Sequence, residues 1–307
     1  LPEILDSAEK KIFAITSQNE SSEFEELSPI LERVLAKIRA GNTEGVKCGM
    51  PELDNITNGF QNSDLILLAA RPSMGKTAFA LNIALNAANK KKVIAIFSLE
   101  MSKEQIAKRF FSIDSQLDAL KIMKGKLEDD DDKTLDESYN RLNDYKIFVD
   151  DTAGISVMEL RSKARRLKTS KNIDLIIIDY LQLMQGSAGK KSSDMNRQQE
   201  ISEISRSLKG LARELNVPVI ALSQLSRNVE LRAEKKPQLS DLRESGSLEQ
   251  DADIVMFLYR PEYYNHTEEN ANQAELIIAK NRNGPTTALA LYFQKECMRF
   301  GTIGNNS

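Results

Sequence analysis

The segment LILLAARPSMGKTAFALNIA, residues 65–84, joins an apolar run to a tight loop and then to a helical pattern. The run Leu65–Ala70 predicts a buried strand, and Phe79 and Ile83 fall on one face of the helix that follows. In such a strand–loop–helix unit, backbone N–H groups of the loop and of the helix N-terminus face a bound anion. The segment therefore predicts a phosphate-binding loop.

The residues of this loop have separate expected roles. We expect Lys76 to reach the β- and γ-phosphates of a nucleotide, and the Thr77 hydroxyl to hold Mg²⁺. The usual pattern begins with a glycine five positions before Gly75, where this chain has Ala70, but the flanking strand and helix still favour nucleotide binding. The expected nucleotide-binding residues are Arg71, Pro72, Ser73, Met74, Gly75, Lys76, Thr77 and Ala78.

Short apolar runs alternate with helical patterns in the rest of the chain. This alternation predicts an α/β fold with a mostly parallel central sheet and helices on both faces. Further strands are expected at Val93–Ser98, Lys146–Val149, Leu175–Asp179, Val217–Leu222 and Ile254–Tyr259. The helices expected around them are Thr77–Asn89, Lys103–Ser112, Ser156–Lys168 and Gln198–Leu215. Ala274–Lys280 and Thr287–Phe293, joined by NRNGP, predict a C-terminal antiparallel hairpin, and the acidic run Glu128–Asp132 predicts a solvated loop.

Composition excludes several classes of protein. Hydrophobic residues make up 41% of the 307 and charged residues 28%, which excludes wholesale disorder. The longest apolar stretches, such as Ile254–Tyr259, fall far short of the roughly 20 residues of a membrane-spanning helix, so no membrane partner is expected. One histidine and two distant cysteines argue against a zinc site and a histidine-dependent triad. The net charge of −3 leaves room for local basic tracks. We expect a cytosolic chain that is a fragment, because it has no signal peptide and does not begin with methionine.

The first 28 residues divide into two parts. Residues 1–15 pattern as a helix with one apolar stripe, which we expect to dock on a neighbouring subunit or on its own domain, a frayed terminal helix being the alternative. Residues 16–28 are polar and acidic, as in a flexible linker. A second short helix is expected near Pro29–Ala40, within a domain that spans residues 29–303, and residues 304–307 are expected to form a disordered tail.

Three polar residues stand at the ends of expected strands. Asp179 projects from the carboxyl edge of the sheet, where open α/β folds bind ligands, and could hold the water shell of the magnesium ion. Glu100 follows the strand after the phosphate-loop helix and could polarise an attacking water, although an acid just before a helix near Ser102 fits the local sequence equally. Gln224 closes another strand, where its amide could sense a γ-phosphate.

Positive charge gathers in three places. Gln185–Arg197 and Arg227–Asp241 follow strand ends and carry several cations each, which favours contact with a nucleic-acid backbone, although either segment alone also fits a solvated surface. Neither segment has stacking aromatics, which argues against base-specific binding. Lys280 and Arg282 stand at the turn of the hairpin and could enter a neighbour's active site as an arginine finger does; an ordinary exposed turn fits equally.

Six segments are similar to one known family: ARPSMGKTAFALNIA, FSLEMS, LIIIDYLQLM, ALSQLSR, LSDLRESGSLEQDADIV and IIAKNRNGP. Through them the chain resembles the C-terminal motor domain of bacterial replicative DNA helicases, the DnaB family, over residues 30–303, and residues 1–15 resemble that family's linker helix. The last three segments are more specific than a phosphate loop, and Ala70 matches the family's own variant. The resemblance implies a RecA-like P-loop NTPase fold, ATP and Mg²⁺ as cofactors, and a homohexameric ring with ATP between subunits. It also implies 5′→3′ translocation along single-stranded DNA.

The resemblance also implies roles by position. Lys76 and Thr77 would bind phosphate and Mg²⁺, Asp179 would support the metal, Glu100 would activate water, and Gln224 would sense the γ-phosphate. Lys280 and Arg282 are implied to act in trans. The resemblance implies contact with the DNA backbone for Arg243, Glu244 and Gly246, and we expect Lys190 and Lys191 of the first basic segment to contact DNA as well. The full-length protein would have a helicase loader and primase as partners in the primosome, in the cytoplasm and at replication forks of the nucleoid. The resemblance also implies an N-terminal domain that carries much of the family's primase interaction and has no counterpart among these residues, so we do not expect this chain alone to bind primase.

Two other classes share part of this pattern. A recombinase or other RecA-like filament former would have the phosphate loop and the sheet, but should lack the segment LRESGSLEQDAD. A nucleotide-gated assembly scaffold without motor activity would have lost the catalytic carboxylate, and Glu100 is present.

Overall fold

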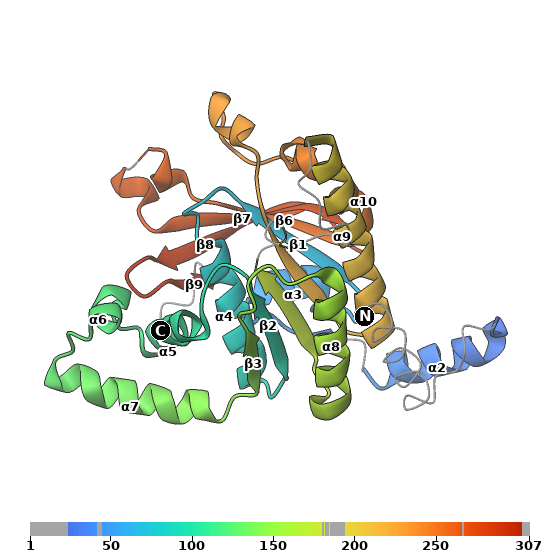
Figure 1. Cartoon of the computed structure of the whole chain (residues 1–307), viewed down its shortest axis with the longest axis horizontal. Helices are drawn as coiled ribbons and strands as arrows, with labels where there is room; N and C mark the ends of the chain where they lie inside the picture. The colour runs from blue at the N-terminus through green and yellow to red at the C-terminus, as the bar shows by residue number, and fades with distance from the viewer. Residues whose placement is uncertain are drawn as a thin grey trace.

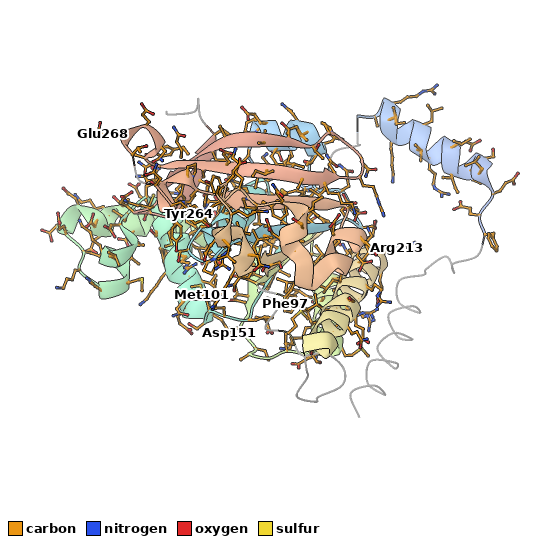
Figure 2. All side chains as sticks on the ribbon, turned by 90° about the horizontal axis from the view of Figure 1, so that it is seen from above. Phe97, Met101, Asp151, Arg213, Tyr264 and Glu268 are labelled. Atoms are coloured by element: carbon orange, nitrogen blue, oxygen red, sulfur yellow. The ribbon has the colours of Figure 1, made fainter. Side chains whose placement is uncertain are left out.

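The computed structural model describes residues 24–41, 45–179, 181, 184, 194–265 and 267–302, and for residues 194–198 and 243–247 it describes the backbone alone. The expected helix over residues 1–15 and the expected tail over residues 304–307 lie outside the described residues. Of the expected linker, residues 24–28 are described, and the helix α2, Leu27–Arg39, begins within them. Figures 1 and 2 show α2 set apart from the body of the molecule, with its side chains exposed.

Over the described residues, the strands form one nine-stranded sheet in the order β3-β2-β4-β5-β1-β6-β7-β8-β9 (Figure 1). The parallel strands are β1 Leu65–Ala70, β2 Ile94–Ser98, β3 Ile147–Asp150, β4 Leu175–Asp179, β5 Val219–Gln224 and β6 Ile254–Tyr259. The antiparallel strands are β7 Gln273–Asn281, β8 Thr287–Gln294 and β9 Arg299–Thr302. The predicted mostly parallel sheet with a C-terminal hairpin is confirmed, and β9 extends the hairpin by a strand that the sequence did not predict.

Helices cover both faces of the sheet. Because side chains alternate along a strand, Ile66 and Leu68 of β1 pack with α4 and α5, whereas Leu65 and Leu67 pack with α8 and α9. The helices after α2 are α3 Pro51–Thr57, α4 Lys76–Asn89, α5 Lys103–Ser115, α6 Ala119–Lys124, α7 Asp129–Asn143, α8 Val157–Lys171, α9 Asp194–Leu215 and α10 Gly246–Asp251. Short 3₁₀ helices lie at Arg227–Leu231, Leu239–Ser245, Pro261–Tyr263 and Glu268–Asn270. None of the described helices is long and apolar enough to span a membrane.

The prediction of a loop over Glu128–Asp132 is wrong, because these residues begin α7. Glu128 is the N-cap and forms a reciprocal capping box with Asp131, and the first turn is acidic throughout. Negative side chains stabilise a helix N-terminus, where the unpaired N–H groups concentrate positive charge. Lys121 of α6 also pairs with Glu128 at 3.0 Å and with Asp131 at 3.1 Å. The charge run therefore starts a helix, although it is largely solvated as expected.

The strand predicted at Val217–Leu222 is shifted by two residues. Pro218 has no N–H to donate, and the pairing of β5 with β1 begins at Val219, opposite Leu65. The shift makes Gln224 the last residue of β5, opposite Ala70 at the end of β1. Gln224 therefore stands at the carboxyl edge of the sheet, as the sequence predicted.

Asp64 precedes β1 at the edge where the parallel strands begin, and the residue is only 8% exposed. Burial and the negative charge of Asp253 raise the pKa of Asp64 to about 6, although the cations Lys209 and Arg282 lie near. The native state therefore holds a proton on Asp64 at pH values where the unfolded chain has released it. That contribution to stability is present below about pH 4 and is lost as the pH rises through about 6.

We expect Asp64→Asn to raise the melting temperature relative to the native chain more at pH 8 than at pH 5, because the amide removes a buried charge that exists at the higher pH. Thermal unfolding at the two pH values measures the difference. Asp136→Asn, an exposed site on α7, is the matched control and should give the same shift at both pH values. An Asp64→Asn shift that is equal at pH 5 and pH 8 would contradict the raised pKa.

Candidate active site

The carboxyl ends of β1, β2, β4 and β5 bring together residues that lie far apart in the chain. A cavity of about 490 Å³ lies at this edge and is lined by Lys76, Thr77, Glu100 and Gln224. Asp179 ends β4 and is bonded to Thr77. The structure therefore gathers the five residues that the sequence assigned to nucleotide, metal, water and γ-phosphate.

The loop from β1 to α4 is shaped for an anion. Gly75 is the N-cap of α4 and has a φ of 94°, in the left-handed region that favours glycine. A side chain there would also come within 3.1 Å of the Phe300 ring. Lys76 is the first residue of α4, so the N-terminal N–H groups of the helix lie at the cavity. Seven of the eight predicted nucleotide-binding residues line the cavity; the exception is Met74, which is buried in the core.

Arg71 lines the cavity, but its guanidinium forms hydrogen bonds within the chain. Its Nη1 donates to the carbonyl of Leu225 at 2.8 Å, and its Nε donates to Glu230 at 2.9 Å. These bonds join the start of the phosphate loop to the segment that follows Gln224. Arg71 therefore holds the two segments together. Because its side chain is bonded within the chain, its predicted contact with a nucleotide would come from its backbone.

Thr77 and Asp179 form the pair that could hold a metal ion. The Thr77 hydroxyl donates to Oδ2 of Asp179 at 2.6 Å, and Asp179 is 2% exposed. Oδ1 of Asp179 is buried without a hydrogen-bond partner, and Lys76 Nζ lies 4.0 Å from it. An orphaned carboxylate oxygen beside a hydroxyl fits a magnesium ion with its water shell, since this ion keeps several waters and takes few protein ligands.

No all-protein metal cage accompanies this pair. Within the described ranges, no three His, Cys, Asp or Glu side chains are grouped so that they could hold a metal ion. Burial lowers the pKa of Lys76, and the charges of Asp179 and Glu100 oppose that effect. The lysine is thus a desolvated cation whose counter-charge is incomplete, which suits the binding of a phosphate.

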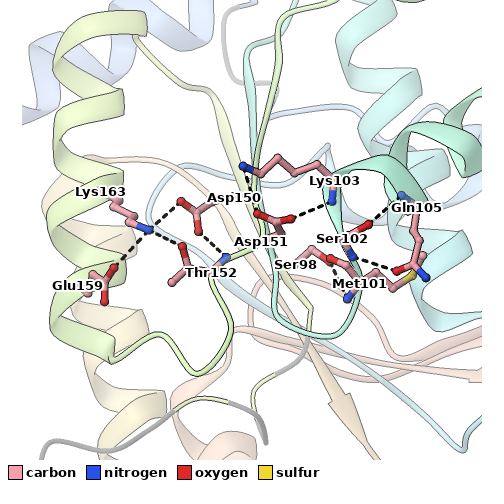
Figure 3. A network of polar contacts seen from close by, with 10 residues as sticks. All are labelled: Ser98, Met101, Ser102, Lys103, Gln105, Asp150, Asp151, Thr152, Glu159 and Lys163. Carbon is pink, nitrogen blue, oxygen red and sulfur yellow. Dashed lines mark hydrogen bonds and ion pairs between the residues drawn. The ribbon is translucent and has the colours of Figure 1, made fainter.

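Glu100 is held in place by the backbone around it. Leu99 N donates to the backbone carbonyl of Asp179 at 2.6 Å, which ties the turn to the end of β4. On the other side, Asp151 accepts from the backbone N–H of Lys103 at 3.1 Å and pairs with its Nζ at 3.2 Å (Figure 3). The Ser102 hydroxyl caps α5 in the same turn. These bonds fix the turn from β2 to α5, which leaves the Glu100 carboxylate facing the cavity.

The sequence did not identify Arg109, which lines the cavity together with the phosphate loop. Burial lowers its pKa, and the charges of Asp179 and Glu100 oppose the shift. Within the described residues, neither Arg109 nor Glu100 makes a hydrogen bond or ion pair, so both face the cavity with their polar atoms open to a ligand. One signal was available: Arg109 lies three residues after Ile106, on the face by which α5 packs against the sheet.

Arg260 was also missed, although it directly follows β6 on the same edge. Its Nη1 donates to the carbonyl of Ser73 at 3.2 Å, and it pairs with Glu262. Its guanidinium lies 4.4 Å from the centre of the Phe293 ring, and both residues line the cavity. The strand-end argument that found Asp179 would have found Arg260 too.

Lys280 and Arg282 lie at the opposite edge of the sheet. Lys280 donates from Nζ to the carbonyls of Glu249 at 2.6 Å and Gln250 at 3.3 Å, at the end of α10. Arg282 follows β7, whose last residue pairs with the first residue of β6. Because a six-residue strand is about 20 Å long, these cations are separated from the cavity of their own chain by the length of β1.

The predicted DNA residues are described in part. Lys190 and Lys191 lie outside the described residues. Arg243 and Glu244 fall in the 3₁₀ helix Leu239–Ser245, and Gly246 begins α10, with the backbone alone described. The basic segment before them is partly neutralised within the chain by Asp241, Glu275 and the Tyr264 ring, whose partners are Arg232, Lys236 and Lys235.

Comparison with known proteins gives consistent matches. Residues 45–302 match the family model described as the DnaB-like helicase C-terminal domain. The chain is 51% identical over 303 residues to the replicative DNA helicase DnaB of Geobacillus stearothermophilus, covering 97% of this chain and 66% of that protein. It therefore spans about two thirds of the length of the curated relative. Among solved structures, an ATPase domain has a TM-score of 0.86 at 42% identity, covering 92% of this chain and 100% of that one. A structure of a DnaB-like replicative helicase and its interactions with primase has a TM-score of 0.82 at 40% identity, covering 96% of this chain and 71% of that one.

We expect Arg109→Ala to weaken the binding of a non-hydrolysable nucleoside triphosphate by about tenfold or more, because a hydrogen bond between charged groups is worth about 1.5–3 kcal/mol. Binding of the diphosphate should fall less, because Arg109 interacts electrostatically with Glu100, the residue expected beside the γ-phosphate. Titration calorimetry with both nucleotides measures the ratio. Arg141→Ala is the matched control, because Arg141 pairs with Asp114 outside this cavity. Equal weakening by the two variants would contradict a contact from Arg109.

Proposed function

Because this chain belongs to the DnaB-like helicase family, we propose that it is the ATP-driven motor of a replicative DNA helicase. Six copies would form a ring that translocates 5′→3′ along single-stranded DNA and separates the duplex at the replication fork. The observation that carries this proposal is the division of the site between two edges of the sheet. A nucleotide cavity lies at one edge, and the expected trans-acting cations lie at the other.

The proposed nucleotide is ATP with Mg²⁺. Lys76 and the N-terminal N–H groups of α4 would bind its β- and γ-phosphates, and Thr77 with Asp179 would hold the ion through its hydroxyl and water shell. Held by these residues, Mg²⁺ would supply positive charge that offsets the negative charge developing on the phosphates. The desolvation of Lys76 and the orphaned Oδ1 of Asp179 support this arrangement.

Glu100 would orient and polarise the attacking water. Its carboxylate lines the cavity together with the phosphate loop, and its charge acts on Lys76 and Arg109 there. Gln224 would contact the γ-phosphate and transmit its loss to the segment after β5, which Arg71 ties to the phosphate loop. Arg109, on the same side as Glu100, would bind a phosphate oxygen in cis.

Lys280 and Arg282 would act on the nucleotide of a neighbouring copy. Both lie one strand length from their own cavity, so they cannot complete it. A neighbour that presents its carboxyl edge to this amino edge would bring the cations and the phosphates together. Repeating that contact from copy to copy, each supplying one edge, is a head-to-tail arrangement that closes into a ring.

Contact with DNA would come from Lys190, Lys191, Arg243, Glu244 and Gly246. Backbone contacts of the latter three would follow the phosphates of a single strand without reading bases. Their segment continues into α10, whose last carbonyls accept from Lys280, so a direct structural path runs from the proposed DNA contact to the trans-acting cations. The residues 1–15 would dock on a neighbouring copy.

The remaining partners are proposed from the family. A helicase loader and primase would bind the longer protein, since one similar structure is that of a replicative helicase and its interactions with primase. The setting would be the cytoplasm, at replication forks on the nucleoid. A RecA-like recombinase is not favoured by the matches, and the segment LRESGSLEQDAD is present.

Strand displacement tests the whole proposal. A fork with a 5′ single-stranded tail should be unwound with ATP and Mg²⁺, whereas a fork with only a 3′ tail should not. Lys76→Ala is the matched control, because it removes the phosphate-binding cation and keeps a helix-forming residue at the first position of α4. Unwinding that is independent of ATP, or that starts from the 3′ tail, would contradict the proposed motor.

We expect mixed assemblies of two inactive variants to recover ATP hydrolysis. Arg282→Ala should bind ATP nearly normally but lose about 10³–10⁵ in rate, as with other arginine fingers, and Lys76→Ala should not turn over. A boundary between them holds one intact phosphate loop and one intact finger, so DNA-stimulated hydrolysis should partly return after co-assembly. Subunit exchange confirmed by solution mass with no return of activity would contradict action in trans.

We expect DNA affinity to be local and sensitive to salt. Replacing Arg243, Lys190 and Lys191 together by alanine should weaken binding of a single strand and reduce the slope of log affinity against log salt by about 0.7 for each lost phosphate contact. A matched triple of exposed cations outside both basic segments, Lys90, Lys91 and Arg213 to alanine, changes the charge equally and should leave the slope unchanged. Affinity that falls with no change of slope would mean that the first three residues act indirectly.

A further inference from the structure

Asp253 is the junction of several elements at the amino edge of the sheet. It is 3% exposed and directly precedes β6. Its Oδ2 accepts from Leu65 N, the first residue of β1, at 2.8 Å and from Lys209 Nζ of α9 at 2.5 Å. Its Oδ1 accepts from Arg282 Nη1 at 3.2 Å. One buried carboxylate thus joins β1, α9 and the residue after β7.

Asp253 holds Arg282 at two points. Besides the side-chain pair, the backbone N–H of Arg282 donates to the Asp253 carbonyl at 2.9 Å. The Arg282 side chain is still 58% exposed, while the carboxylate that holds it is only 5% exposed. A guanidinium carries five N–H donors, and the bond to Asp253 uses one nitrogen. The arginine is therefore anchored from inside, with most of its donors directed to solvent.

The electrostatic setting favours the anchored position. Lys209 and Arg282 both form ion pairs with Asp253, and Asp64 adds a second carboxyl group close by. Lys280 adds a cation beside Arg282. Without the Asp253 carboxylate, the two cations of the hairpin would repel each other without a charge beneath them to hold Arg282.

We propose that Asp253 is a positioning residue for hydrolysis in trans, which holds the Arg282 guanidinium of one copy in the place where the next copy's phosphates meet it. The proposal rests on the proposed function of Arg282. A free arginine side chain must lose rotamer entropy when it is fixed, whereas donors that are fixed beforehand need no reorganisation during the reaction. The bond to Asp253 orders the Arg282 side chain before it meets the neighbour's nucleotide.

This role predicts a specific kinetic signature. Asp253→Asn keeps an oxygen that can accept from Leu65 N but removes the charge that holds Arg282. The kcat for ATP should fall by about tenfold or more with KM unchanged, because the finger acts in the transition state. Lys209→Met is the matched control: it removes the other cation that binds the same carboxylate, and kcat should stay within about threefold of the native value.

Subunit mixing separates this role from a purely structural one. If Asp253 acts through Arg282, its defect belongs to the copy that donates the finger. Asp253→Asn mixed with Lys76→Ala should then recover activity, because the second variant donates an intact finger to an intact phosphate loop. Asp253→Asn mixed with Arg282→Ala should not recover, because neither copy donates a sound finger.

The opposite pattern would overturn the proposal. If Asp253 acts through β1 on its own phosphate loop, recovery appears with Arg282→Ala and is absent with Lys76→Ala. Equal loss of kcat in Lys209→Met would also overturn it. The pair Lys76→Ala with Arg282→Ala is run alongside: its failure refutes the trans finger itself and the positioning role with it, whereas its success with the wrong Asp253 pattern refutes the positioning role alone. Where thermal unfolding shows that Asp253→Asn has lost its fold, Asp253→Glu, which keeps the charge but shifts it by one methylene, carries the same two mixtures.

Discussion

The parallel pairing of β1 between β5 and β6 sets the position of every functional group in this chain. β1 is fully buried, and its backbone is bonded on both sides, so it can neither slide nor tilt without breaking two ladders. Its carboxyl end leads into the phosphate loop, and its amino end is held by the carboxylate of Asp253. The length of this one strand therefore separates the nucleotide cavity from the cations that follow β7.

The charged groups near the core lie in two sets, one at each edge of the sheet, and the two sets differ in how their charges are compensated. At the carboxyl edge, Lys76 and Arg109 are desolvated cations that interact electrostatically with Asp179 and Glu100, and Lys76 Nζ lies 4.0 Å from Oδ1 of Asp179. Groups left in this state are expensive unless a ligand completes them, which is the usual condition of a binding site. At the amino edge the charges are paired internally, because Asp253 forms ion pairs with Lys209 and Arg282. Burial, with the negative charge of Asp253, raises the pKa of Asp64 beside them. The carboxyl edge thus has the charges of a binding site that a nucleotide would complete, whereas the amino edge is compensated by ion pairs within the chain.

Sequence reasoning found what depends on local order along the chain. The phosphate loop, Asp179 and Gln224 follow from one rule, that the carboxyl ends of parallel strands meet, and the same rule would have reached Arg260. Arg109 was missed because its spacing from Ile106 indicates the buried face of α5 but does not show that this face reaches the cavity, which depends on how α5 packs across the sheet. The prediction of a loop at Glu128–Asp132 was wrong because it considered only the solvation of the charges. Acidic residues also stabilise a helix N-terminus, and these residues begin α7. The bond between Asp253 and Arg282 joins residues 29 apart through the β6–β7 register, and pairing registers are not legible in the sequence.

The proposed division of labour between the two edges means that a single chain lacks a complete catalytic site. The most direct measurement is ATP turnover per chain over a dilution series, with the solution mass determined in the same samples. Turnover should follow the fraction of chains that are assembled and extrapolate to nearly zero for the isolated chain. An isolated chain that hydrolyses ATP as fast as the assembly would show that Arg282 and Lys280 are not needed from a neighbour, and would contradict the two-edge arrangement.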